Sequence, residues 1–210
     1  GVFSTERNLA PLTDICYLAD RYDALVVVAD SHSTGFLGPK GQGTPEEVGV
    51  FDRIDILMNT LRKALDGASG GFTTGRKELI DDLRQSSKPY LFSNTPAPPV
   101  VLASIKALER VRQRPDLRKP LWESITYFRN EMAPLGFNII DGNHPIVPIM
   151  LRDELKTVEM VRTINDLVNY VVAFSFPVVG RGQARIRVQL SDAHSREQLD
   201  RALSTFERAW

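Results

Sequence analysis

Central to this chain is the segment Met58-Asn-Thr-Leu-Arg-Lys-Ala-Leu-Asp-Gly-Ala-Ser-Gly-Gly71, in which Lys63 stands among small residues. A mostly apolar run, Ile54 to Leu57, comes just before it and is typical of a short buried strand. Glycine and alanine let a backbone approach a flat ligand or a phosphate closely. A partly desolvated lysine amine condenses readily with an aldehyde to form a Schiff base. The alternative is a surface lysine in a glycine-rich turn, because most such turns are only turns.

The composition is that of an ordinary soluble globular protein. Of its 210 residues, 42% are apolar and 25% are charged. The 26 basic and 26 acidic side chains cancel, so no charge excess indicates binding to nucleic acid or to a membrane surface. Cys16 is the single cysteine, which excludes an internal disulfide and is typical of a reducing compartment. We expect it in the core, on one face of a helix. The sequence has no initiator methionine, so we expect a fragment or a processed product.

The first half of the sequence predicts a parallel α/β sheet. Apolar residues recur at a helical period between Asn8 and Tyr22, and the β-branched run Ala24 to Ala29 follows at once as a strand. The next strand is Ile54 to Leu57, and Gly70 to Gly75 is a further short one. A helix is expected over 76–86, and the proline-rich connector 88–99 is expected not to be helical.

The second half predicts two helices and then a small α+β domain. The helices cover 100–112 and 116–135, and the longer one places Leu121, Ile125, Phe128 and Met132 on one side. Beyond them the expected strands are 146–151, 171–176 and 184–190, and the expected helices are 153–170 and 195–210. The last helix begins with a capping-box pattern, Ser195-Arg-Glu-Gln198.

Two groups of polar residues suggest a ligand site. His32 follows one predicted strand and Lys63 follows the next, and the carboxyl ends of parallel strands meet at one edge of a sheet. An imidazole can stack on a planar ring, although a locally bonded loop histidine is an equal alternative. Strand alternation places Arg185 and Arg187 on one face. Arginine suits carboxylate binding, although a solvent-exposed strand face is the commoner explanation.

Taken together, four separated motifs resemble one family. They are Ala-Asp-Ser-His-Ser-Thr-Gly35, Thr-Leu-Arg-Lys-Ala-Leu-Asp-Gly-Ala-Ser-Gly-Gly71, Lys-Pro-Tyr-Leu-Phe-Ser-Asn94 and Gly-Gln-Ala-Arg-Ile-Arg-Val-Gln-Leu-Ser-Asp-Ala-His194. In this order they resemble the α-oxoamine synthases, pyridoxal-phosphate enzymes of the aspartate-aminotransferase-like fold (fold type I). The resemblance implies an α/β chain with part of the large parallel-sheet domain, 1–100, and connecting helices with a C-terminal α+β domain, 101–210.

The resemblance also implies roles for individual residues. Lys63 matches the lysine that forms the Schiff base with pyridoxal 5'-phosphate and moves the α-proton, and His32 matches a histidine at the cofactor ring. Thr60 and Ser4 match cofactor contacts, and Ser93 matches a residue that reaches the cofactor phosphate of the neighbouring subunit. Arg187 matches the arginine that binds the substrate carboxylate. No metal ligand is implied.

The activity implied by the resemblance is an acyl transfer. Glycine and acetyl-CoA condense to 2-amino-3-oxobutyrate and CoA, in a homodimer with shared active sites, in the cytoplasm or, in a eukaryote, in mitochondria. No nucleic-acid or membrane partner is implied.

Three positions depart from the family pattern. Ala29 stands where the family has the acid that pairs with the pyridine nitrogen, and Arg62 and Asp66 replace glycines. Asp30 matches a second acid, and strand alternation points it to the opposite face. These departures favour an alternative, a catalytically impaired homologue or fragment that serves as a structural partner subunit. Another is a pyridoxal-phosphate enzyme that uses a different acyl-CoA.

Overall fold

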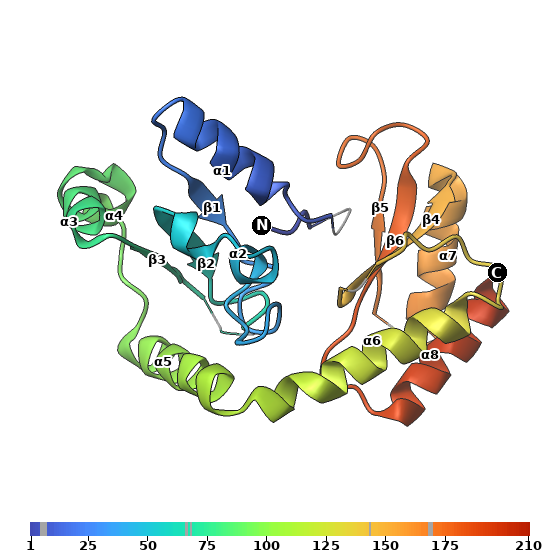
Figure 1. Ribbon diagram of the computed structural model, residues 1–210. Helices are drawn as coiled ribbons and strands as arrows, with labels where there is room; N and C mark the ends of the chain where they lie inside the picture. Colours follow the sequence, from blue (N-terminus) through green and yellow to red (C-terminus); the bar gives the residue numbers. More distant parts are fainter. Residues whose placement is uncertain (5–7, 66, 68, 143, 168–169) are drawn as a thin grey trace. The chain divides into compact units, whose positions relative to one another are not determined.

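The computed structural model describes residues 1–4, 8–65, 67, 69–142, 144–167 and 170–210. The chain forms two compact units (Figure 1). Residues 1–3 and 8–115 make up the first unit, and Ser4 belongs with residues 116–210 in the second. The helix α5 (Pro98–Gln113) therefore belongs to the first unit. The family resemblance places the boundary between the two domains earlier, between residues 100 and 101. That domain boundary stays a prediction.

The first unit contains a three-stranded sheet in the order β1-β2-β3. Strand β1 (Val27–Ala29) pairs in parallel with β2 (Ile56–Thr60), as the sequence predicts. Strand β3 (Gly71–Gly75) pairs antiparallel with β2, so the sheet is mixed. The Lys63 segment is therefore the loop of a β2–β3 hairpin, closed where Thr60 pairs with Gly71.

The core of the first unit forms where α1 (Leu12–Arg21) packs against the parallel strands (Figure 1). Leu12 and Cys16 are four residues apart and therefore share one helix face, where both are buried. They contact the inward-facing Val26 and Val28 of the neighbouring strand segment. The expected core position of Cys16 is confirmed.

Two short helices lie between the longer elements of the first unit. Helix α2 (Thr44–Glu47) lies between β1 and β2, and α4 (Lys88–Phe92) follows α3 (Lys77–Ser86). The expectation of a non-helical connector over 88–99 is thus wrong for Pro98 and Pro99, with which α5 begins, and for its first turn, 88–92. Pro89 lies in that turn, where a missing N–H removes no helical hydrogen bond.

The second unit contains an antiparallel sheet in the order β4-β6-β5. Its strands are β4 (Ile146–Arg152), β5 (Val172–Phe174) and β6 (Ala184–Gln189), close to the expected ranges. Helices α6 (Arg118–Met132), α7 (Glu154–Asp166) and α8 (Arg196–Ala209) complete it. The expected helix 153–170 ends early, at Asp166.

An apolar core joins α6 to α8. Ile125, Phe128 and Met132 are fully buried, as their helical spacing predicts. The ring of Phe128 meets that of Phe206 edge to face, with centroids 6.4 Å apart. The capping box that starts α8 is also confirmed: the Gln198 amide donates to Ser195 Oγ at 3.2 Å, and the Ser195 amide donates to Gln198 Oε1 at 2.8 Å.

Across the described ranges, no helix has both the length and the apolar composition needed to cross a bilayer. The same part of the chain contains no cluster of three or more potential metal-ligating His, Cys, Asp or Glu side chains.

The edge-to-face contact predicts a large effect on stability. Phe128→Ala should lower the free energy of unfolding by about 3–5 kcal/mol, because it removes a buried ring and leaves a cavity. Urea denaturation followed by circular dichroism measures this. Leu155→Ala is the control, since Leu155 is exposed on α7, and its effect should stay within about 0.5 kcal/mol. Equal losses for the two variants would contradict this account of the core.

Candidate functional site

The turns that follow β1 and β2 are bonded to each other. The Asp30 amide donates to Met58 O at 2.9 Å, which extends the parallel ladder beyond Ala29. Ser31 Oγ accepts from the Thr60 amide at 2.9 Å, and Ser31 O accepts from the Ala64 amide at 3.4 Å. One residue of the first turn thus holds the second turn at two points.

His32 and Lys63 lie on these bonded segments. His32 follows Ser31, and Lys63 lies between the Thr60 and Ala64 amides that Ser31 binds. Both side chains are half-buried. Arg62 is exposed, and Asp66 lies outside the described residues. The segments that carry the expected Schiff-base lysine and ring-stacking histidine are therefore adjacent at one end of the sheet.

Buried polar atoms without hydrogen-bond partners gather just before Lys63. Thr60 Oγ1 is buried and has no partner among the described residues. The same is true of both amide atoms of Asn59, a side chain that is 5% exposed. Such groups are costly to bury unless a ligand or another group binds them. The sequence singles out Thr60 but gives no signal for Asn59.

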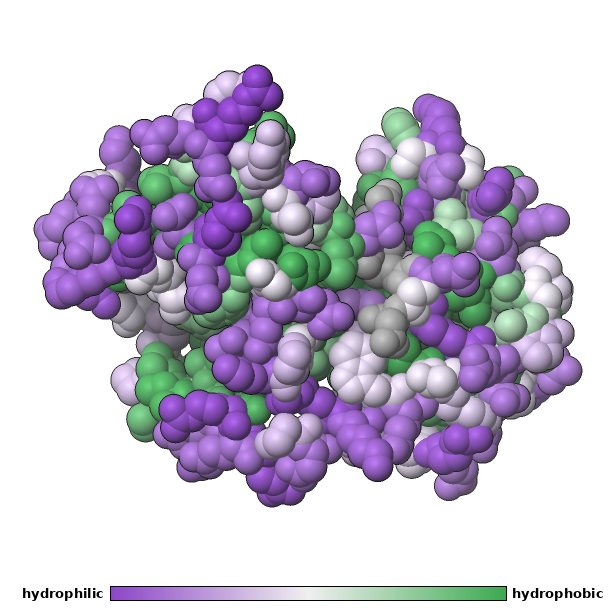
Figure 2. Space-filling model, viewed as in Figure 1, coloured by the Kyte–Doolittle hydropathy of each residue, from purple (hydrophilic) through white to green (hydrophobic). Residues whose placement is uncertain are grey.

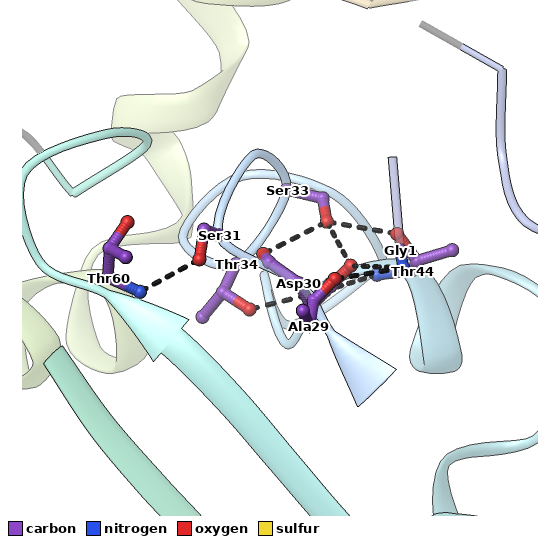
Figure 3. Close-up of polar contacts among 8 residues, drawn as sticks. All are labelled: Gly1, Ala29, Asp30, Ser31, Ser33, Thr34, Thr44 and Thr60. Carbon is purple, nitrogen blue, oxygen red and sulfur yellow. Dashed lines mark hydrogen bonds and ion pairs between the residues drawn. The ribbon is translucent and has the colours of Figure 1, made fainter. Parts of the chain in front are cut away.

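Where β1 ends, the carboxylate of Asp30 forms a separate buried polar cluster (Figure 3). Ser33 Oγ donates to Asp30 Oδ1 at 2.5 Å. Asp30 Oδ2 accepts from Thr34 Oγ1 at 3.2 Å and from the Thr44 amide at 2.8 Å. Ser33 and Thr44 share a further hydroxyl contact of 2.9 Å. Sequence reasoning missed Ser33, Thr34 and Thr44. The polar run from Asp30 to Thr34 at a strand end is the signal that could have indicated them.

Two glycines pack against this carboxylate. A Cβ at Gly43 would lie 1.9 Å from Asp30 Oδ2, and one at Gly1 would lie 1.7 Å from Asp30 Oδ1. The Gly1 nitrogen also donates to Ala29 O at 2.9 Å. A side chain at either position would therefore displace the Asp30 oxygens.

Ala29 faces the other way. Burial alternates along β1, so Val27 and Ala29 are exposed and Val28 between them is buried. Asp30 continues the buried register and is fully enclosed. The expectation that Asp30 faces away from Ala29 agrees with this pattern. Neither Ala29 nor Asp30 therefore presents a carboxylate to a ligand on the exposed face of β1.

The remaining predicted residues lie on other elements. In the second unit, Arg187 Nη1 donates to Ser4 O at 3.4 Å, and its guanidinium lies 4.7 Å from the centre of the Phe174 ring. Partial burial lowers the pKa of Arg187. Its neighbour Arg185 is only 3% exposed, so a solvent-exposed strand face is excluded for it. Ser93 is exposed at the end of α4, outside these groups.

A cavity of about 310 Å³ adjoins the lysine turn within the first unit. Its lining is mainly apolar and comes from the turn and from α5: Leu61, Leu65, Gly67, Pro99, Val100, Ala103, Ser104 and Ala107. Beside it, Figure 2 shows apolar side chains over α5, where Val101, Leu102 and Ile105 are exposed. Exposed apolar surface of this kind is typical of a face that another polypeptide covers.

Comparison with known proteins identifies the architecture. The model of the family described as aminotransferase class I and II matches residues 5–206. Serine palmitoyltransferase from S. paucimobilis, solved with a bound PLP–myriocin aldimine, superposes with a TM-score of 0.93 at 26% identity. The match covers 100% of this chain and 53% of that one. The expected aspartate-aminotransferase-like fold is confirmed.

Curated relatives give a consistent result. The 2-amino-3-ketobutyrate coenzyme A ligase of Escherichia coli K12 is 49% identical over 99% of this chain and 52% of its own length. The mitochondrial protein of that name from Mus musculus is 46% identical over 98% of this chain and 50% of its own length. The chain spans about half the length of the curated relatives it matches.

The clash at Gly43 predicts a loss of stability. Gly43 and Gly49 both have a left-handed φ, +96° and +73°, but a Cβ at Gly49 would meet nothing within 4 Å. Gly49→Ala should therefore cost about 1 kcal/mol from backbone strain alone, whereas Gly43→Ala should cost about 2 kcal/mol more. Thermal unfolding of the two variants measures the difference. Equal losses would show that Asp30 moves aside freely.

Proposed function

The chain belongs to the aminotransferase class I and II family, and we propose that it carries half of a pyridoxal-phosphate-dependent acyltransferase. The proposed reaction joins glycine and acetyl-CoA to give 2-amino-3-oxobutyrate and CoA. Support comes from the relatives named 2-amino-3-ketobutyrate coenzyme A ligase. The observation that carries the proposal is the bonded pair of turns, with Lys63 on one and His32 on the other.

The residues of the first unit fit two of the three reactive parts of the cofactor. Half-buried Lys63 offers an amine for the aldehyde. The unpartnered, buried hydroxyl of Thr60 is a donor suited to the phosphate. The pyridine nitrogen finds no acid, because Ala29 has no polar side chain and the carboxylate of Asp30 is enclosed on the other face. Bound pyridoxal phosphate supplies an aldehyde that captures amines and a ring that accepts negative charge from the substrate α-carbon.

The proposed roles follow from the chemistry of each side chain. Lys63 Nζ takes the α-proton of glycine, since an unprotonated amine is a general base. His32 would hold the cofactor ring through its imidazole. Arg187 binds the glycine carboxylate through two parallel N–H groups, a geometry that its planar guanidinium provides. Ser4, whose carbonyl accepts from Arg187, is proposed as a cofactor contact.

We also propose that the protein works as a homodimer with shared sites, in which Ser93 reaches the phosphate of the neighbouring subunit's cofactor. Exposed apolar side chains support an interface: Phe92, next to Ser93, is 84% exposed, and Leu102, on α5, is 67% exposed. The proposed compartment is the cytoplasm, or mitochondria in a eukaryote, and the mouse relative bears the word mitochondrial in its name.

A second candidate function is a catalytically impaired partner subunit, and the exposed Ala29 favours it. A pyridinium without a carboxylate partner is less readily protonated and is therefore a weaker electron sink. A third candidate keeps the cofactor and uses a different acyl-CoA.

Removal of the Lys63 amine distinguishes the proposed enzyme from the proposed non-catalytic partner subunit. The protein supplied with pyridoxal phosphate should show the absorbance of a lysine-bound cofactor, and Lys63→Ala should abolish it, because the variant lacks the amine that forms the Schiff base. Lys156→Ala, which changes an exposed lysine on α7, should leave the spectrum intact. If the unaltered protein retains no cofactor under these conditions, the enzymatic proposals are wrong.

Restoring an acid to β1 tests the role of Ala29. Ala29→Asp should raise cofactor affinity and turnover about tenfold or more, as expected for a new hydrogen bond to a charged group. Val27→Asp is the matched control, since it adds the same charge to the same exposed face two residues earlier. Cofactor titration and initial rates measure both variants. No gain from Ala29→Asp, or equal gains from both, would contradict the account of this position.

A further inference from the structure

The carboxylate of Asp30 is committed to its own loop. Its three hydrogen-bond donors come from Ser33, Thr34 and Thr44, and Asp30 itself is 0% exposed. A buried charge is tolerated only when it is fully hydrogen-bonded. The loop from 30 to 44 is therefore held in the one conformation that delivers these donors to the two oxygens (Figure 3).

An amide would replace this carboxylate only in part. An ionised carboxylate accepts hydrogen bonds only, whereas an asparagine side chain presents two N–H donors on one side. In the structure Oδ1 accepts from a hydroxyl and Oδ2 accepts from a hydroxyl and a backbone N–H. An NH₂ group at the Oδ2 position would face the Thr44 backbone N–H, which can only donate. An NH₂ group at the Oδ1 position would face the Ser33 hydroxyl, which can accept, but the negative charge that strengthens the other two hydrogen bonds would be lost.

The loop in turn fixes the segment that carries Lys63. Ser31 is the next residue after Asp30, and it accepts from the Thr60 and Ala64 amides. These two N–H groups lie on the two sides of Lys63 in the sequence. Ser31 thus anchors the backbone on both sides of Lys63, and it directly follows Asp30 in the sequence.

We propose that Asp30 is a positioning residue for Lys63 and acts through the two acceptors of Ser31. It touches neither substrate nor cofactor, because its side chain is enclosed on the face opposite Ala29. The part of this proposal that concerns cofactor capture rests on the proposed function. The part that concerns the geometry of the turn does not.

Amide hydrogen exchange in the cofactor-free protein tests the geometry. Ser31→Ala removes the acceptor of the Thr60 amide and keeps the Asp30 cluster, so exchange at Thr60 should accelerate about fivefold to tenfold while Ala64 changes little. Asp30→Asn should accelerate exchange at both amides. Ser31→Thr keeps a hydroxyl and should restore protection at Thr60, a rescue that a general loss of stability would not show.

Two controls define the result. Ser86→Ala removes an exposed hydroxyl that donates to Asp82 on α3, and exchange at Thr60 and Ala64 should not change. Amides of α1, in the core of the same unit, report general unfolding of that unit and should keep their protection in every variant. If Asp30→Asn leaves Thr60 and Ala64 protected, the proposal is wrong. If Asp30→Asn does not fold, Ser33→Ala, which removes one donor to Oδ1, must accelerate exchange at both amides, and its failure to do so also overturns the proposal.

Cofactor binding distinguishes failure of the proposed function from failure of the positioning role of Asp30. With pyridoxal phosphate added, Ser31→Ala should retain the lysine-bound absorbance with an affinity reduced about fivefold to tenfold, and Ser31→Thr should recover it. If the unaltered protein takes up no cofactor while the exchange pattern holds, the proposed function fails and the positioning role stands. If the variants bind the cofactor like the unaltered protein and the exchange rates do not change, the positioning role fails.

Discussion

The parallel pairing of β1 with β2 is the constraint on which the site depends. Its register sets Ala29 opposite Met58 and continues through the Asp30 amide to Met58 O. Because both strands run in the same direction, the two turns that follow them leave the sheet at the same end. A slip of one residue would exchange the two faces of β1, exposing Asp30 and burying Ala29. The core of Val26 and Val28 against α1 opposes such a slip, since it would bring these apolar side chains into water.

Two neighbouring groups of polar atoms at this end of the sheet differ in how completely they are hydrogen-bonded. In the closed cluster around Asp30, every carboxylate oxygen has a partner. At the end of β2, just before the lysine turn, Thr60 Oγ1 and the Asn59 amide have no partner among the described residues. A satisfied network stabilises the scaffold, and unsatisfied donors are available to a ligand. This difference is the physical basis for assigning a structural role to Asp30 and a binding role to Thr60.

The sequence predicts most elements of this fold, because their apolar spacing is regular. The α6 face of Ile125, Phe128 and Met132 and the capping box of α8 can be identified in this way. Helix α4 could not be predicted, since a proline weighs against a helix until its place in the first turn is known. Lys63, His32 and Thr60 were found from motifs, whereas the bonds from Ser31 to the lysine turn were not. A hydrogen bond between residues about thirty positions apart depends on strand register, which local pattern does not specify.

The packing of Gly43 against Asp30 has a consequence for how this protein can change. Between Gly43 and the Asp30 carboxylate there is no room for even one methyl group, so this buried side of the site tolerates few substitutions. In front of it, Val27, Ala29 and Arg62 are exposed, and each can vary without repacking a core. Single replacements on that front surface can therefore alter reactivity while the backbone that carries Lys63 keeps its shape. A scaffold divided in this manner is suited to diverge in chemistry faster than in architecture.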